Sequence, residues 1–214
     1  MHSTETYLKS TWEEVMTKYS APSQLQHEYW NEIQSAYTAP GRHYHNLNHL
    51  KYMMGKAVEY QEEIRDMDTL KFSIFYHDIV YDTNRNDNEE RNAQIARDRL
   101  EKLTIPEEKI ARCDSQILAT KSHKRTRDKD TNYLLDFDLA YLGESPSLYR
   151  EYSAKIRKEY AQYPDALFNQ GRKKALEHFL KMDRIFKTEE FYKKYEKQAR
   201  ENLRAELKDA RRPL

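Results

Sequence analysis

The chain contains very little cysteine, glycine or proline. Cys113 is the only cysteine among 214 residues, so a disulfide within the chain is impossible and a cytoplasmic setting is favoured. Four glycines and six prolines are too few for a β protein, which would need many tight turns. No segment approaches the roughly eighteen apolar residues of a membrane-spanning helix, and the N-terminus lacks the apolar core of a secretion signal. We therefore expect neither membrane insertion nor secretion.

The chain also lacks an excess of charge of either sign. Its 37 basic and 36 acidic residues give a net charge of +1, which provides no signal for nucleic-acid binding. Charged residues make up 34% of the chain and aromatic residues 12%. Disordered chains have few aromatic residues and a large net charge, so we expect a folded protein. Interspersed charges of both signs are typical of amphipathic helices with ion-paired outer faces.

Apolar residues recur at steps of three and four along most of the sequence, as in Leu8, Trp12 and Val15. This is the spacing of one apolar face on an α-helix, so the sequence predicts an all-α fold. Gly143 is expected as the C-cap of the helix before it. We expect helices at about residues 7–19, 22–37, 47–64, 68–80, 89–103, 107–121, 130–142, 146–163, 165–182 and 188–211.

Three short segments hold most of the chemically informative residues: 42–49 (RHYHNLNH), 75–82 (FYHDIVYD) and 135–139 (LDFDL). Asp78 lies in an apolar stretch that is expected to be helical, where an unpaired ionised aspartate would be costly to bury. A bound cation would compensate that charge, and Asp138 in the third segment raises the same question. The first two segments also contain four of the eight histidines, namely His43, His45, His49 and His77.

Histidine and aspartate at these positions point to a metal site. Adjacent residues on a helix point about 100° apart, so His77 and Asp78 can share an ion only with ligands from other helices. His49 and Asp138 would supply those ligands, in the way that helical bundles build metal sites in their cores. Imidazole nitrogen and carboxylate oxygen suit Mn, Fe, Co, Ni or Zn, with Mg as a further candidate, and the lack of thiolates excludes a structural zinc finger.

A histidine, a later His-Asp doublet and a distal aspartate resemble the signature of the HD superfamily of metal-dependent phosphohydrolases. Segments 42–46, 75–82, 88–93 and 136–143, with shorter matches at 171–172 and 199–203, are similar to a family of short bacterial HD proteins. The resemblance covers nearly the whole chain. It implies one HD-type helical bundle over residues 1–214, with a metal-site core at about 40–143 and a helical extension at about 145–212.

The resemblance also assigns roles to residues. It implies His49, His77, Asp78 and Asp138 as metal ligands, with Asp136 as the rival for the last place. Asp138 is preferred because the residue-Asp-Leu context resembles the distal aspartate segment of the superfamily.

Two more distant likenesses bear on the chemistry. Residues 45–49 (HNLNH) are similar to the HNxxH segment of cyclic-nucleotide phosphodiesterases, in which the first histidine donates a proton to the leaving oxygen; this implies that role for His45. Residues 77–83 resemble a segment of the guanosine tetraphosphate hydrolases, but Tyr81 replaces an acidic residue of theirs, while Asp82 is retained. That difference weakens a pyrophosphohydrolase assignment.

Several further residues are candidates for binding a second metal or the substrate: His123, Asp82, Glu89, Lys124, Arg125 and Arg127. Basic side chains pair well with phosphate oxygens, although a solvated loop explains the basic segment at 121–129 equally well. Glu89 also has a simpler interpretation, because an acidic residue at a helix start is favourable to the helix dipole.

Together these features predict a phosphohydrolase, a phosphomonoesterase or phosphodiesterase, with one or two metal ions. Its substrate would be a small anionic phosphate ester, with nucleotides as the leading class. Asp78 or Asp138 would orient or deprotonate a water molecule, and His45 would protonate the leaving oxygen. Two alternatives stay open: a metal-bound regulatory module that binds a nucleotide without turnover, and a helical interaction protein with a structural metal. A homo-oligomer is compatible with all three.

Overall fold

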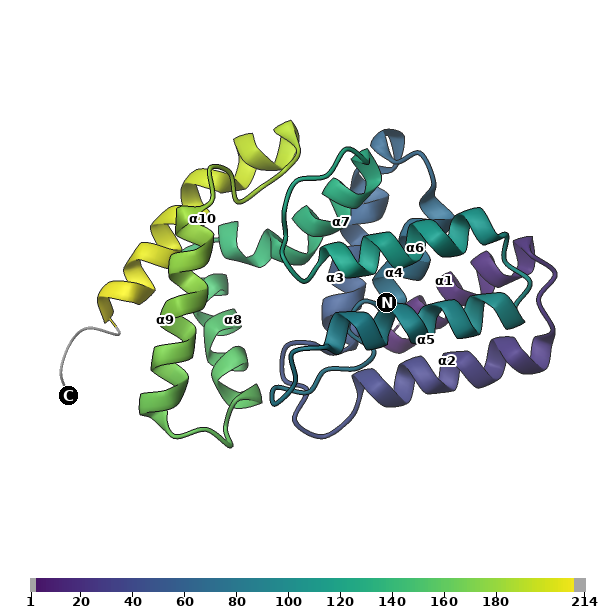
Figure 1. Ribbon diagram of the computed structural model, residues 1–214, viewed down its shortest axis with the longest axis horizontal. Helices are drawn as coiled ribbons and strands as arrows, with labels where there is room; N and C mark the ends of the chain where they lie inside the picture. The colour runs from purple at the N-terminus through teal and green to yellow at the C-terminus, as the bar shows by residue number, and fades with distance from the viewer. Residues whose placement is uncertain (1–2, 210–214) are drawn as a thin grey trace. The chain divides into compact units, whose positions relative to one another are not determined.

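The structure, a computed structural model, describes residues 3–209 and is all-helical within them, which confirms the predicted fold class. This part of the chain forms ten α-helices and no strand, and Figure 1 shows how the helices follow one another along the chain. The α-helices are α1 (Thr4–Lys18), α2 (Ser23–Tyr37), α3 (Leu47–Glu59), α4 (Met67–Tyr76), α5 (Asn88–Lys102), α6 (Glu107–Ala119), α7 (Lys129–Leu139), α8 (Pro146–Glu159), α9 (Asp165–Lys181) and α10 (Glu189–Asp209). None of these helices is both long enough and apolar enough to cross a lipid bilayer.

Most helices begin where the sequence places a cap or a proline. The Asn46 side chain accepts a hydrogen bond from the Asn48 amide at 2.9 Å and caps α3, as predicted. Asp66 caps α4 in the same way, and Pro146 occupies the first turn of α8. The end that we expected for α10, near residue 211, lies outside the described residues.

Four helices end at least three residues earlier than predicted, and one of them is α8, which ends at Glu159 instead of about residue 163. α3 ends at Glu59, and the 3-10 turn η1 (Gln61–Glu63) follows it. α4 ends at Tyr76 instead of about residue 80, and α7 ends at Leu139, where the chain tightens into the 3-10 helix η2 (Ala140–Gly143). The sequence did not predict these ends, because apolar residues continue at helical spacing past each of them. The backbone hydrogen bonds nevertheless leave the α-helical pattern there.

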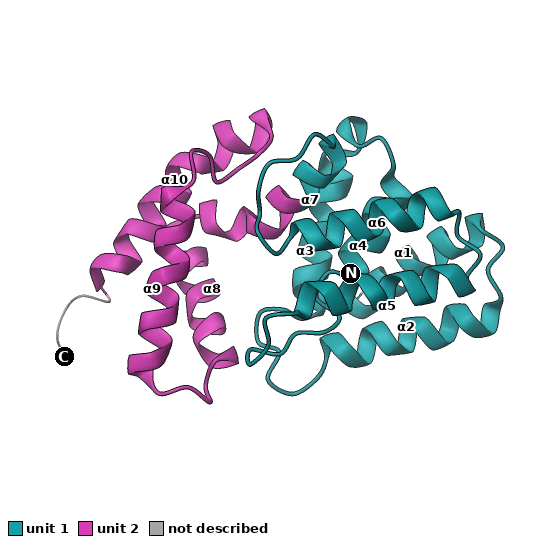
Figure 2. Ribbon diagram, viewed as in Figure 1, with its two compact units in different colours: residues 1–134 teal, residues 135–214 magenta. Residues whose placement is uncertain are grey.

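Figure 2 divides the chain into two compact units, residues 1–134 and residues 135–214. The boundary falls inside the continuous helix α7. The sequence suggested a helical extension that starts near residue 145, after η2, whereas the second unit already includes the last turn of α7.

The first unit is built around α4. All eight residues from Thr69 to Tyr76 are buried, as expected for its apolar sequence, and α3, α5 and α6 pack against this helix. The rings of Trp12 and Trp30 meet Phe75 edge to face, with centroid distances of 5.4 and 6.5 Å. A helix that is surrounded in this way is a fixed support for the residues that follow it.

The second unit is organised by α10, which packs against η2 and α9. Phe186, Phe191 and Tyr195 form a buried ring cluster at its start. Gly143, at the end of η2, lies directly against Tyr195: a Cβ atom at residue 143 would stand 2.5 Å from the Tyr195 Cβ and 2.8 Å from its carbonyl oxygen. This close approach, and not the C-cap that the sequence suggested, is the reason for glycine here, because the cap position belongs to Glu144.

Replacing Gly143 with alanine should therefore destabilise the protein. The added methyl group meets backbone atoms that cannot rotate away, so we expect a loss of about 1–3 kcal/mol in the free energy of unfolding, measured by urea titration. Gly171→Ala is the matched control, because it lies inside α9 and a Cβ there meets nothing within 4 Å. That change should stabilise the protein by roughly 0.5–1 kcal/mol. Equal effects of the two substitutions would contradict the packing argument.

Candidate metal centre

His49 reaches the centre because Asn46 fixes the start of α3. The Asn46 side chain accepts from the Asn48 amide and donates to the His43 carbonyl at 2.9 Å, so it connects the preceding loop to the helix. His49 then lies in the first turn of α3 and is buried, with 2% of its surface exposed. The predicted placement of His49 inside the first helical turn, with His45 just before the cap, is confirmed.

His77 follows the last residue of α4, and its ring is fixed by the helix that it ends. Its Nδ1 lies 2.8 Å from the Ile74 carbonyl oxygen. A carbonyl can only accept a hydrogen bond, so this contact places a proton on Nδ1 and turns Nε2 toward the centre, where its lone pair would be available to a bound cation. A hydrogen bond of this kind is what orients a metal-binding histidine in known sites. His77 therefore offers a fixed, buried nitrogen, and only 1% of the residue is exposed.

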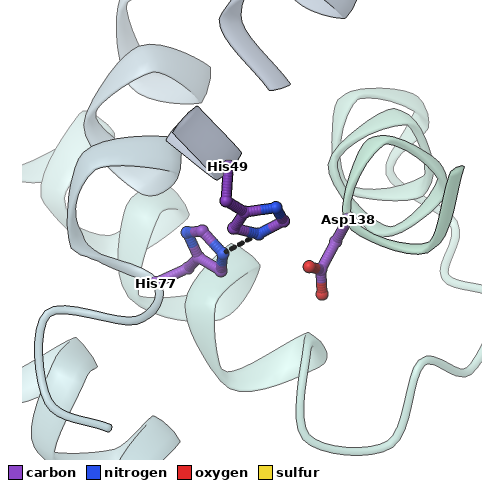
Figure 3. A group of neighbouring side chains, drawn as sticks. All are labelled: His49, His77 and Asp138. Atoms are coloured by element: carbon purple, nitrogen blue, oxygen red, sulfur yellow. Dashed lines mark hydrogen bonds between the residues drawn. The ribbon is translucent and has the colours of Figure 1, made fainter. Parts of the chain in front are cut away.

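The Nε2 atoms of His77 and His49 lie 3.3 Å apart, and a carboxylate oxygen of Asp138 completes the group. One ligand atom from each of the three residues lies within 4.8 Å of the other two. Figure 3 shows the two rings and the carboxylate turned toward a common point. Two imidazole nitrogens and one carboxylate oxygen are a donor set that fits a divalent transition metal such as Zn, Mn, Fe, Co or Ni.

Asp78 stands beside this group. Its Oδ2 lies 3.1 Å from Nε2 of His77 and 4.0 Å from Nε2 of His45. The side chains of His45 and Asp78 are partly open to solvent, at 16% and 19% exposure. The His45 ring stacks on Tyr81 with a centroid distance of 4.0 Å and an angle of 27°. His45 and Asp78 are therefore accessible groups next to two buried histidines.

The sequence suggested that His77 and Asp78 lie inside a helix. This was wrong, because α4 ends at Tyr76 and both residues follow it. The chain leaves the helical path after Tyr76 because side chains take the carbonyl groups that a longer helix would use. Asn92 donates to the His77 carbonyl and accepts from the Val80 amide at 2.7 Å. Arg42 donates to the carbonyls of Asp78 and Ile79, at 2.7 and 2.9 Å. Both His77 and Asp78 are held in a turn as a result.

Arg42 and Asn92 were not predicted as parts of the site. Asn92 had a readable signal, because it is a polar residue on the apolar stripe of α5 that also includes Ala93, Ala96 and Leu100. Arg42 offered no signal of this kind, since the Asp78 and Ile79 carbonyls that it binds lie 36 and 37 residues away in the sequence.

Asp136, the alternative to Asp138 as a metal ligand, is engaged in hydrogen bonds with another segment of the second unit. It is fully buried and accepts hydrogen bonds from the Lys187 amide at 2.7 Å, the Thr188 amide at 2.8 Å and the Thr188 hydroxyl at 2.7 Å. Burial raises the pKa of Asp136 to about 6, although these donors act in the opposite direction. Its carboxylate is thus engaged at the start of α10, whereas Asp138 is a member of the metal-ligating group.

The other candidates do not join a metal-ligating group in the part of the chain that the structure describes. Asp82 accepts from the backbone and side-chain nitrogens of Asn84, at 2.9 and 3.0 Å, and the backbone bond contributes most to the lowered pKa of Asp82. Glu89 lies in the first turn of α5. His123 follows α6 with a φ of 49°. Lys124, Arg125 and Arg127 are exposed. A role for these residues in binding the substrate stays a prediction.

The lone cysteine is not a candidate nucleophile. Cys113 is fully buried in α6, and burial raises the pKa of its thiol to about 12, so the reactive thiolate is not populated near neutral pH.

Comparison with known proteins adds no assignment: the chain matches no family model, no curated protein and no solved structure. What can be said of its chemistry therefore depends on the residues themselves.

The different tasks of Asp136 and Asp138 can be separated by stability measurements on metal-free protein. Asp136→Ala leaves two buried amides and a hydroxyl without their acceptor, so the free energy of unfolding should fall by about 1–3 kcal/mol. Asp138→Ala, at a half-buried position, should cost less by at least about 1 kcal/mol. Urea titration of both variants checks this order. A larger loss for Asp138→Ala would mean that Asp138 has the structural role.

Proposed function

We propose that this protein is a metal-dependent phosphohydrolase that cleaves a phosphate ester, with a nucleotide or related metabolite as the leading substrate class. One observation carries the proposal: ligand atoms of His49, His77 and Asp138 lie within 4.8 Å of one another, and the His77 ring is oriented with Nε2 toward His49. The resemblance of the same residues to the HD signature supports the reaction class, and the substrate class rests on that resemblance alone.

His49, His77 and Asp138 would hold the metal, and Asp78 is near enough to His77 to join them. A divalent cation in such a site supplies charge stabilisation for the phosphoryl group and favours deprotonation of water. Asp78 or Asp138 would orient the attacking water and accept its proton. Both aspartates are partly exposed to solvent, as residues that act on a bound substrate must be.

His45 would donate a proton to the leaving oxygen. Its Nε2 lies 4.0 Å from the Asp78 carboxylate, and its ring is held flat against Tyr81. Tyr44 packs on the rings of both His45 and His49, with centroid distances of 4.8 Å in each case. His45 is thus fixed beside the candidate metal ligands while its side chain stays partly open to solvent, as a proton donor to a bound substrate must be.

The first test is metal content. Purified protein should bind about one equivalent of a transition metal, and His77→Ala or Asp78→Ala should remove both the metal and any phosphatase activity. Elemental analysis and a screen of phosphorylated metabolites measure the two effects. His27→Ala is the matched control, because His27 is an exposed residue of α2 and its loss should change neither. Full metal occupancy in both site variants would refute the assignment. Metal binding without turnover of any phosphate ester would instead favour a regulatory module.

The second test separates His45 from His49. His49→Ala should lower both metal affinity and activity, whereas His45→Ala should keep the metal and reduce kcat by on the order of 10²–10⁴. The loss should shrink for p-nitrophenyl esters, because p-nitrophenolate leaves readily without a proton.

His43→Ala is the control for His45→Ala, since His43 is exposed and its one recorded contact with Asn46 uses only its backbone carbonyl. If His45→Ala lost its metal, or lost equal activity on good and poor leaving groups, His45 would not be the proton donor.

A further inference from the structure

The guanidinium of Arg42 connects the two segments that contain His45 and Asp78. Its Nη1 donates to the His45 carbonyl at 3.0 Å and to the Asp78 carbonyl at 2.7 Å, and its Nη2 donates to the Ile79 carbonyl at 2.9 Å. A planar guanidinium with several fixed donors can hold three acceptors in one geometry. The backbone before α3 and the turn after α4 are therefore joined through a single side chain.

Stacked rings extend this connection to the side chains. The Arg42 guanidinium lies over the rings of Tyr37 and Tyr81, at 5.1 and 5.5 Å from their centroids. The Tyr81 ring also stacks on the imidazole of His45, with a centroid distance of 4.0 Å. The Tyr37 hydroxyl accepts from the Asp78 amide at 3.1 Å. Arg42 thus supports the ring that orients His45 and the residue that binds the Asp78 backbone.

The local backbone is shaped to present Arg42. Gly41 has a φ of +91°, a conformation that side-chain-bearing residues rarely adopt, and the Arg42 amide closes the turn on the Ala39 carbonyl at 3.2 Å. The three recorded acceptors of the guanidinium are all backbone carbonyls, so the side chain acts on backbone geometry and not as half of an ion pair.

We propose that Arg42 is a positioning residue, which holds the His45 imidazole and the Asp78 carboxylate in register, 4.0 Å apart. Its consequence for catalysis rests on the function proposed above, whereas the positioning itself does not. His77 has separate supports in the Ile74 carbonyl and Asn92, and His49 has the cap of α3. Loss of Arg42 should accordingly loosen His45 and Asp78 and leave the two buried histidines in place.

The test uses Arg42→Lys, which keeps the charge but loses the planar fork, and Arg42→Met, which loses both. The readouts are the NMR shifts of the His45 ring protons, which are shielded by Tyr81, and hydrogen exchange of backbone amides in the metal-free protein. Both variants should move the His45 ring shifts in the same direction as Tyr81→Leu, which is measured beside them as a reference, and should speed exchange of the Asp78 amide by about tenfold. The Val80 amide, held by Asn92, should change less.

Arg99→Lys is the matched control. Arg99 is a half-buried arginine of the same unit that binds Glu32 with two hydrogen bonds of 2.8 Å and lies over the Tyr29 ring at 5.4 Å. It should change overall stability without moving the His45 ring shifts. Wild-type ring shifts and exchange rates in Arg42→Lys would overturn the proposal, even if Arg42→Met failed to fold.

An activity measurement adds a second arm. With the metal bound, Arg42→Lys should lower kcat at least about tenfold, and the loss should be clearly smaller in a His45→Ala background, since the part of the loss that acts through His45 is then already gone. Equal losses in both backgrounds would also overturn the positioning role. If the wild-type protein had no phosphatase activity but the NMR changes occurred, the proposed function would fail while the positioning by Arg42 stood.

Discussion

The end of α4 depends on donors that come from elsewhere in the chain. In a helix that continued, the carbonyls of residues 77–79 would accept from amides four residues later. Here Asn92 and Arg42 supply those hydrogen bonds, so the chain can turn away without leaving buried carbonyls unsatisfied. The His77 ring then faces His49, and Asp78 lies at the edge where solvent reaches it. The positions of His77 and Asp78 in the candidate centre therefore depend on side-chain donors that replace the backbone amides of a longer helix.

In the second unit the buried backbone groups that need partners are amides, and carboxylate side chains bind them. Between α9 and α10 the amides of residues 185–188 would be buried without partners, and the carboxylates of Glu196 and Asp136 accept them. Arg200 donates to carbonyls at the end of α9 and just beyond it. Residues two apart on a helix point about 200° apart, so Asp136 can be engaged within the unit while Asp138 faces another way.

The helices could be predicted from the sequence because apolar spacing and capping residues are local signals. His77 and Asp138 could be singled out for a related reason, since polar residues in apolar runs are visible without a structure. His49 lies in a polar segment and was singled out by its place in the HD-like pattern. The choice between Asp136 and Asp138 was harder, because both lie in the same run and only the partners of Asp136 in residues 187–188 tell them apart. The end of α4 and the packing of Gly143 on Tyr195 depend on contacts between distant residues, for which the sequence contains no comparable signal.

The double use of the Asn92 amide limits which residues can occupy that position. Its side-chain oxygen accepts from the Val80 amide, and its side-chain nitrogen donates to the His77 carbonyl. Aspartate has the right length but no donor, glutamine has both groups at the wrong distance, and serine is too short to span the two partners. In related chains we expect the exposed positions of α5 to vary, whereas residue 92 should remain asparagine. An evolutionary record of this helix would therefore show one invariant amide among changing charges.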